Sequence, residues 1–240
     1  MPSEADPHTY EPAPQDAGTI ADADLVFYTG LMYEPSPLVE LLENSVCGSE
    51  ALAEVGESVF PIEFKEGGHD DHDDHGEKGH DDHDEEGHDD HDDHGGHEGH
   101  GHGAYDPHFW FDPNRVVYAS EFIESKLIEL DPSNAASYQA AGDTYATELS
   151  SLTGQVSQLI GSIPSQNRKL ITTHESLGYL EAKFGLEVLS TIIPDLDSSN
   201  EITPAQLVGV IDVIEDNNVK VIFIEAEAPS VYAETIVAET

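Results

Sequence analysis

Short apolar runs rich in β-branched and aromatic residues alternate along this chain with longer segments whose apolar positions recur every three or four residues. The short runs predict strands, and the longer segments predict amphipathic helices. Strands that alternate with helices indicate parallel sheets and an α/β fold, in which ligands bind at the carboxyl ends of strands. The expected strands are 24–28, 59–64, 169–172, 186–191 and 219–224, and the expected helices are 14–23, 35–43, 113–130, 133–163, 175–184 and 203–217.

Two local signals mark the starts of long helices. Asp112-Pro113 and Asp131-Pro132 each place an N-capping residue before a proline suited to the first helical turn. The second start opens a segment that contains no proline before Pro164. It predicts one helix of about 30 residues and roughly 45 Å, long enough to run along both halves of a molecule of this size. We therefore expect an N-terminal part over 1–130, a linking helix over 131–163 and a C-terminal part over 164–240.

Residues 66–103 have a composition unlike the rest of the chain. They comprise 16 acids, 11 histidines, one lysine and otherwise only glycine. The sequence GHDDHDDHG at 68–76 recurs at 87–95. A segment without apolar side chains cannot bury a core, so we expect a disordered insert within the N-terminal part.

Charge and composition exclude several classes of protein. The 240 residues include 50 acids and 8 bases, a formal net charge of −42, and so few cations cannot build the basic face that nucleic acid requires. Outside the insert, 34 acids and 7 bases leave a net of −27, as expected of a protein that stays hydrated in high salt. The chain has no apolar run of about 18 residues, so it predicts no membrane span. Its single cysteine excludes a disulfide framework.

Three histidines lie outside the insert, and each stands at an expected boundary between elements: His8, His108 and His174. Three neutral imidazoles supply three of the four ligands of tetrahedral zinc and leave one position for a carboxylate or water. A single loop histidine is as readily explained by a hydrogen bond as by a metal. Three of them beside a histidine-rich segment favour a metal, so we predict that they bind one ion tightly.

The insert histidines form a second expected set of ligands. His-Asp-Asp-His spacing at this density favours metal contact over a purely solubilising role, and ligands without a fixed scaffold bind several ions weakly and reversibly. We expect the insert to gather zinc near the tight site. The auxiliary ligands would be His69, His72, His75, His80, His83, His88, His91, His94, His97, His100 and His102.

Three acids are candidates for orienting the imidazoles. Asp106 and Asp112 flank His108 and could accept from a ring N–H, although Asp112 already has a role as an N-cap. Glu225 follows an expected strand and could face the bound metal. The alternative is that Glu225 is a solvated surface carboxylate.

The surroundings of the three isolated histidines resemble the motifs of a known family. His8 stands in DPHTYEP, His108 in DPHFWFDP and His174 in THESLGYL. These segments look like the three histidine motifs of the zinc-type solute-binding proteins of ABC importers, a group that includes manganese-binding lipoproteins and adhesin-like members. The segments ADLVFYTG at 23–30, ITP at 202–204 and VIFIE at 221–225 extend the resemblance over nearly the whole chain apart from the insert.

The resemblance implies two α/β lobes with parallel sheets, bridged by one rigid long helix, with the metal site in the cleft between the lobes. It implies a non-enzymatic extracytoplasmic protein, membrane-anchored or at the cell surface, that captures zinc and delivers it to an ABC permease; we expect a monomer. Manganese-type members have a glutamate at the third motif where this chain has His174, and imidazole favours zinc over manganese.

Two alternative functions remain open at this point. One is binding of manganese or another divalent metal by an adhesin-like lipoprotein of the same fold. The other, from a different class, is a metallohydrolase that uses three histidines and a metal-bound water. The chain has no HExxH- or HxHxDH-type motif, which disfavours the hydrolase.

The two ends of the chain depart from the family pattern. Family members begin with an export signal and a first strand ahead of the first motif, whereas Met1 stands seven residues before His8. The family also supplies a fourth, carboxylate ligand from a segment that would lie beyond Thr240. We therefore expect truncation at both ends, with an incomplete C-terminal lobe.

Overall fold

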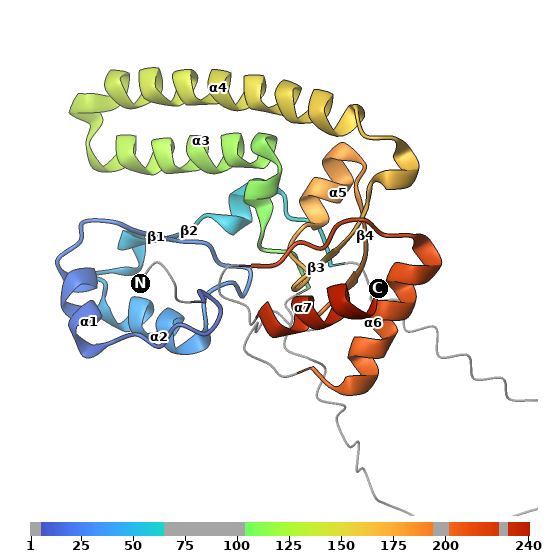
Figure 1. Ribbon diagram of the computed structural model, residues 1–240. Coiled ribbons are helices and arrows are strands. Elements are labelled where there is room, and N and C mark those ends of the chain that lie inside the picture. Colours follow the sequence, from blue (N-terminus) through green and yellow to red (C-terminus); the bar gives the residue numbers. More distant parts are fainter. Residues whose placement is uncertain (1–5, 65–103, 194–201, 226–229) are drawn as a thin grey trace, which may run out of the picture.

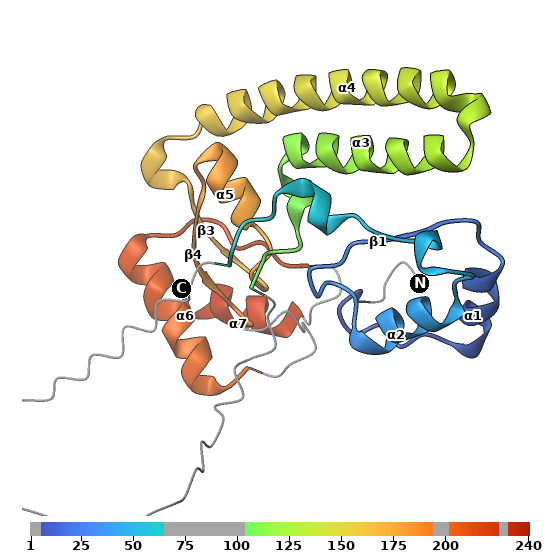
Figure 2. The same cartoon turned by 180° about the vertical axis from the view of Figure 1, so that it is seen from behind.

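The computed structural model describes residues 6–64, 104–193, 202–225 and 230–240. Two α/β halves lie next to each other, and two long helices lie along one side of the molecule, the longer of which extends over both halves (Figure 1, and from behind in Figure 2). Each half contains a parallel two-stranded sheet. The predicted α/β class, with two lobes and a long connecting helix, is therefore confirmed. The insert over 66–103 lies outside the described residues.

The N-terminal half begins with two helices and two strands that alternate. They are α1 (Pro14–Ala21), β1 (Val26–Tyr28), α2 (Ser36–Ser45) and β2 (Leu52–Glu54). β1 and β2 pair in parallel, with Val26 opposite Leu52 and Tyr28 opposite Glu54. The sequence predicts the first three of these elements but not β2, because three residues are too few to show a periodicity.

The strand predicted over 59–64 is wrong. Gly56–Val59 form a 3-10 turn, Phe60 has a left-handed backbone with φ of 52°, and Pro61 has no N–H to donate to a ladder. Glu63 forms an isolated antiparallel bridge to Tyr105, on the other side of the insert. The segment therefore closes the base of the insert and adds no strand to the sheet.

The two long helices are α3 (Pro113–Leu130) and α4 (Ala135–Gly161). Asp112 caps α3, since its Oδ1 accepts a hydrogen bond from the backbone N–H of Asn114 at 3.0 Å. α4 has 27 residues, follows the 3-10 turn Pro132–Asn134 and is about 40 Å long at 1.5 Å per residue. It packs antiparallel to α3 and reaches α5 of the C-terminal half (Figure 1). Both of its ends lie within two residues of the predicted 133–163.

The C-terminal half contains β3 (Lys169–Thr172), α5 (Gly178–Phe184), β4 (Glu187–Thr191), α6 (Pro204–Asn217) and α7 (Ser230–Glu239). β3 and β4 pair in parallel. α5 begins three residues later than predicted, and the sequence does not predict α7. 

The strand predicted over 219–224 does not form. Ile222 makes an isolated parallel bridge to Ile171, with Ile171 donating to the Val221 carbonyl and Phe223 donating to the Ile171 carbonyl. The segment therefore lies beside β3, as expected of a third strand, but pairs with it at one position. The ladder between β3 and β4 is also irregular at Ile171, because its register shifts between Leu170 and Ile171.

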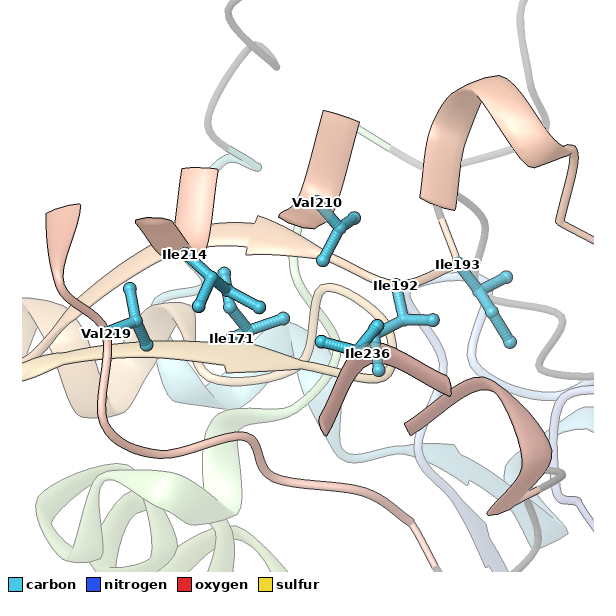
Figure 3. Packing of buried hydrophobic residues seen from close by; sticks show 7 residues of the cluster. All are labelled: Ile171, Ile192, Ile193, Val210, Ile214, Val219 and Ile236. Atoms are coloured by element: carbon cyan, nitrogen blue, oxygen red, sulfur yellow. The ribbon is translucent and has the colours of Figure 1, made fainter. Parts of the chain in front are cut away.

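Two hydrophobic clusters form the cores. One joins β3, β4, α6 and α7 (Figure 3), and its buried members are Ile171, Ile192, Ile193, Val210, Ile214, Val219 and Ile236. The other lies in the N-terminal half beneath α3, and its buried members are Val55, Val59, Phe109, Ala119 and Tyr179. Tyr179 belongs to α5, so the C-terminal half contributes a side chain to the core of the N-terminal half.

Candidate metal centre

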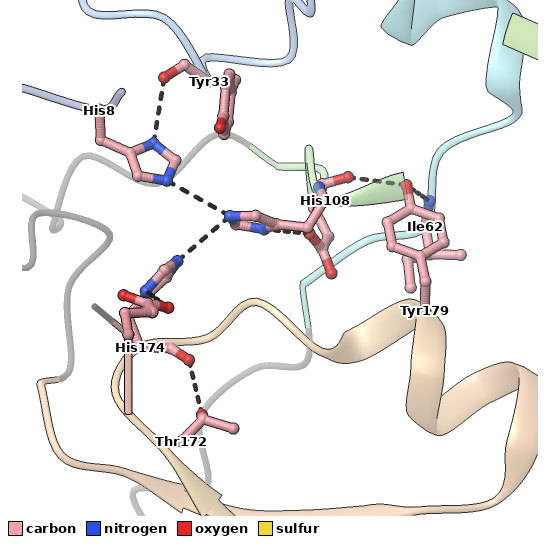
Figure 4. Close-up of polar contacts among 9 residues, drawn as sticks. His8, Tyr33, Ile62, His108, Thr172, His174 and Tyr179 are labelled. Carbon is pink, nitrogen blue, oxygen red and sulfur yellow. Dashed lines mark hydrogen bonds and ion pairs between the residues drawn. The ribbon is translucent and has the colours of Figure 1, made fainter. Parts of the chain in front are cut away.

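The three isolated histidines meet at one point between the two halves (Figure 4). The Nε2 atom of His108 lies 3.4 Å from that of His8 and 3.3 Å from that of His174. In the part of the chain that the structure describes, they are the one group of potential ligands whose donor atoms lie within 4.8 Å of one another. Tetrahedral zinc with Zn–N bonds of 2.0–2.1 Å requires N–N separations of about 3.3–3.4 Å, so the spacing suits a zinc ion.

Each imidazole has an acceptor beside its other ring nitrogen. His8 Nδ1 lies 3.1 Å from the Tyr33 carbonyl oxygen, and His108 Nδ1 lies 2.8 Å from Asp106 Oδ1. His174 Nδ1 lies 2.6 Å from Glu225 Oε1. A ring nitrogen that faces an acceptor carries the proton, which leaves the lone pair on Nε2, where a metal ion would bind.

The contact between His174 and Glu225 differs from the other two. The two atoms are close, but the geometry is not that of an aligned hydrogen bond, and among the described residues Nδ1 has no such partner. The Glu225 backbone is held separately, since its N–H donates to Thr173 Oγ1 at 3.0 Å. The Glu225 carboxylate therefore lies beside Nδ1 as an ion-pair partner rather than as an aligned acceptor.

The first two histidines are positioned by the same local motif. In each Asp-Pro-His sequence, the aspartate Oδ1 accepts a hydrogen bond from the histidine backbone N–H, at 2.9 Å for Asp6 and His8 and at 2.8 Å for Asp106 and His108. Such a turn is a common use of aspartate, and it fixes the backbone of the histidine. Asp106 is 1% exposed and also contacts the ring of its histidine, whereas the ring of His8 bonds to Tyr33.

His174 lies two residues after the last residue of β3, at the carboxyl end where the sheet topology predicts a ligand. Thr172 Oγ1 donates to the His174 carbonyl at 2.7 Å and fixes the turn after the strand (Figure 4). The Ile193 N–H donates to the Thr173 carbonyl at 2.7 Å, so the ladder with the neighbouring segment continues up to the histidine.

Tyr33 is part of the site, and the sequence did not indicate it. Its ring packs edge-on against His8, with centroids 4.7 Å apart, and against Trp110 at 5.1 Å. It follows three consecutive residues with left-handed backbones: Gly30, Leu31 and Met32, with φ of 74°, 55° and 62°. The available signal was Gly30, which suits such a conformation, but the carbonyl that binds His8 has no sequence signature.

Two carboxylates hold this left-handed turn in place. Glu34 accepts from the N–H groups of Thr29 and Gly30 at 2.6 and 2.9 Å, and Glu54 accepts from the Leu31 N–H at 3.1 Å. Non-glycine residues in this conformation each cost about 1–2 kcal/mol, so such contacts are needed to maintain it.

The electrostatics of the cluster favour the neutral form of His8. Burial, followed by the proximity of His108 and His174, lowers the pKa of His8 from 6.5 to about 4. A neutral imidazole is the form that binds metal, so at neutral pH this ligand needs to release no proton.

The remaining predicted site residues divide into three groups. Asp106 and Glu225 contact imidazoles, as described above. Asp112 is placed elsewhere: it caps α3, and its carboxylate lies 3.8 Å from Arg115 and 3.5 Å from Lys183. Its role in the structure is therefore the helix cap, and the interpretation of Asp112 as a support for an imidazole is wrong. The eleven insert histidines lie outside the described residues.

The fold and this cluster of imidazoles define a two-lobe α/β protein with a candidate metal centre between its lobes. The chain belongs to the family described as zinc-uptake complex component A, periplasmic (ZnuA), which matches residues 1–240. The resemblance seen in the sequence is thus confirmed. In the described residues, no helix combines the length and apolar character needed to cross a membrane.

The names of the curated relatives refer to different metals, zinc in some and manganese in others. The chain is 29% identical over 244 residues to the high-affinity zinc uptake system protein ZnuA of Bacillus subtilis, covering 100% of this chain and 66% of the relative. It is 24% identical over 238 residues to the manganese-binding lipoprotein MntA of Halalkalibacterium halodurans, covering 98% of this chain and 65% of the relative. The chain thus spans about two thirds of the length of these relatives.

Solved structures show the same fold. A crystal structure of ZnuA superposes with a TM-score of 0.76 at 25% identity and covers 100% of this chain and 76% of that one. The periplasmic zinc-binding protein TroA from Treponema pallidum also has a TM-score of 0.76, at 21% identity, and covers 100% of this chain and 73% of that one.

Proposed function

We propose that this chain captures a zinc ion outside the cytoplasmic membrane and delivers it, without catalysis, to an ABC permease. The observation that carries the proposal is the spacing of the imidazole Nε2 atoms, since those of His8 and His174 lie 3.4 and 3.3 Å from that of His108, together with acceptors at Nδ1 of His8 and His108 and a carboxylate 2.6 Å from Nδ1 of His174. Three oriented neutral donors bind a divalent ion, and delivery then requires only docking and release.

The ligand set supports zinc rather than manganese as the cargo. All three converging donors are imidazole nitrogens, which suit zinc, whereas manganese prefers carboxylate and other oxygen ligands. The two acids at the site, Asp106 and Glu225, lie beside Nδ1 atoms rather than among the converging Nε2 atoms. A fourth ligand from a carboxylate or water would complete the tetrahedron.

The insert is proposed as an auxiliary collector of zinc. The described residues on either side of it are joined, since the Phe64 N–H donates to the Ala104 carbonyl at 3.3 Å. Ala104 is two residues from Asp106, whose carboxylate contacts His108. Histidines within the insert are thereby tethered next to the proposed tight site, where ions that they bind weakly would be available for transfer.

Zinc titration of the 240-residue chain tests the proposal. His8→Ala, His108→Ala and His174→Ala should each abolish the tight site, measured by competition with a chromophoric chelator. His88→Ala, in the insert, is the matched control and should leave the tight site intact. Unchanged affinity in two of the three site variants would end the proposal. Competition between zinc and manganese at the same site distinguishes the two metals, and tighter binding of manganese would contradict the assignment of zinc.

A further inference from the structure

Tyr179 belongs to α5 of the C-terminal half, but its side chain lies in the core of the N-terminal half. The residue is 1% exposed and packs in one cluster with Val59 and Phe109. The Arg115 guanidinium lies 5.9 Å from the centre of its ring. The ring therefore connects the two halves directly, close to the three imidazoles (Figure 4).

A second contact on the same face of α5 supports this attachment. Lys183 follows Tyr179 by one helical turn, and its Nζ lies 3.5 Å from Asp112 Oδ1, at the start of α3. α5 is therefore held against the N-terminal half at two successive turns.

The Tyr179 hydroxyl completes a short ladder at the base of the insert. The Asp106 N–H donates to the Ile62 carbonyl at 2.9 Å, as in an antiparallel pair. The hydroxyl binds the two remaining backbone groups of this pair: it accepts from the Ile62 N–H at 3.2 Å and donates to the Asp106 carbonyl at 2.8 Å. Burial raises the pKa of Tyr179 to about 12, so the hydroxyl keeps the proton that it donates.

α5 also approaches the carboxylate of Asp106. A Cβ atom added at Gly178 would lie 2.6 Å from Asp106 Oδ2, so only glycine allows the helix to come this close. The backbone of Asp106 is thus bound by Tyr179, and its carboxylate is enclosed by Gly178. The other carboxylate oxygen contacts both the ring and the backbone of His108.

We propose that Tyr179 is a positioning residue for the metal site: its hydroxyl holds Asp106, and Asp106 in turn orients His108. His174 lies on the loop that leads into α5, four residues before Gly178, so the same attachment sets the position of His174 relative to His108. The inference rests on the proposed metal-binding function and adds a residue that touches none of the three imidazoles.

Tyr179→Phe in the 240-residue chain tests the inference, because it removes the hydroxyl and keeps the ring. Tyr138→Phe is the matched control, since the Tyr138 hydroxyl donates to Asp131 at 3.2 Å near the start of α4. Three measurements are made on each protein: zinc affinity by chelator competition, the visible absorption spectrum of bound Co²⁺, and the tautomer of the His108 ring by long-range ¹H–¹⁵N NMR of the metal-free chain.

Tyr179→Phe should weaken zinc binding roughly tenfold, as expected for a residue that helps to orient a metal ligand but does not bind the metal itself. It should also change the Co²⁺ spectrum and replace the single Nδ1–H tautomer of His108 by a mixture. A merely structural loss of stability would move neither the spectrum nor the tautomer. Tyr138→Phe should match the wild type in all three measurements.

The outcomes separate this inference from the proposed function. A wild-type chain that binds no zinc contradicts the function, and the His108 tautomer in the metal-free variant still decides the role of Tyr179. Tight zinc binding with an unchanged tautomer in Tyr179→Phe overturns the inference alone. Should the phenylalanine variant fail to fold, 3-fluorotyrosine at position 179 alters the donor strength of the hydroxyl without removing it. Unchanged His108 ring shifts in that protein would equally overturn the inference.

Discussion

One carboxylate oxygen of Asp106 holds His108 at two points, lying 2.8 Å from its backbone nitrogen and 2.8 Å from its ring Nδ1. Both residues are almost completely buried, at 1% and 3% exposure. The orientation of the central imidazole of the cluster thus depends on a single acidic side chain, which leads to a first prediction.

Asp106→Ala should lower zinc affinity by about 10- to 100-fold, because the supporting acceptor of a metal-binding histidine is lost. Asp131→Ala is the control, as it removes an exposed acid that accepts hydrogen bonds from Ser133 and Asn134 in the turn between α3 and α4. It should lower stability slightly, through the loss of these hydrogen bonds, and leave zinc affinity unchanged. Chelator competition and urea unfolding measure the two effects, and equal affinities in both variants would contradict the prediction.

Glu225→Gln should weaken zinc binding less than Asp106→Ala, by under about tenfold. The side chain of Glu225 is 31% exposed, so water screens its charge, and glutamine keeps an oxygen that can accept from His174 Nδ1. Glu129→Gln, on the exposed face of α3 beside Lys126, serves as the control. A loss in Glu225→Gln as large as that in Asp106→Ala would show that the charge itself is required.

The metal-free protein should lose stability through His8 as the pH falls from 6.5 towards 4. In this window the unfolded chain, whose His8 titrates near 6.5, binds a proton that the folded chain, with its pKa of about 4, does not. Well above pH 6.5 both states are neutral at His8 and the effect vanishes. Between pH 7 and pH 5 the loss should be about 2 kcal/mol.

Urea unfolding of the wild type and of His8→Asn at both pH values isolates this contribution from that of the many carboxylates. The wild type should lose more stability than the variant over this interval. Parallel losses in the two proteins would mean that His8 is not shielded from protonation in the folded state.

Replacing 66–103 by a single glycine should reduce the number of zinc ions bound and retain one tight site. The backbones of Phe64 and Ala104, on either side of the replaced segment, are already hydrogen-bonded, so Lys65 followed by glycine would form a two-residue turn that can close the ladder. Equilibrium dialysis gives the stoichiometry and chelator competition gives the affinity. Disappearance of the tight site on deletion would refute the separation of a collector from a capture site.

Gly30→Ala should destabilise the protein by about 2 kcal/mol or more, because Gly30 has φ of 74° and an added Cβ would collide with the Glu54 carboxylate. Gly18→Ala in α1 is the control: nothing lies near its Cβ position, and alanine should add up to about 1 kcal/mol through helix propensity. Urea unfolding compares the two, and an unaffected Gly30→Ala would show that the left-handed turn before Tyr33 is not under strain.

Much of this architecture could be predicted where a local signal exists. The cap at Asp112 and the long proline-free segment after Asp131 located α3 and α4, and the isolation of His8, His108 and His174 indicated which residues would meet. Leu52–Glu54 could not be predicted, because its three residues become a strand only through pairing with β1. The apolar run 59–64 misled for the opposite reason, since its composition suits a strand but Pro61 and the left-handed Phe60 prevent one.

The supports of the imidazoles were predictable to different degrees. Asp106 and Glu225 are acids and could be proposed from their proximity in sequence to a histidine or to a strand end. The group that contacts His8 is a backbone carbonyl, which every residue possesses, and a turn stabilised by Glu34 and Glu54 brings it into place. Asp6 and Asp106 stand in identical Asp-Pro-His motifs and both accept from the backbone N–H of their histidine, and Asp106, which is almost completely buried, also lies 2.8 Å from the ring of its histidine.

The position of Tyr179 in the core of the opposite half also affects how the molecule unfolds. A fragment that ended at residue 163 would have a cavity where the Tyr179 ring lies against Val59 and Phe109, and filling such a space with solvent or leaving it empty costs several kcal/mol. We therefore infer that the two lobes melt in one cooperative transition. The boundary between them, where the three imidazoles meet, does not separate two independently folding units.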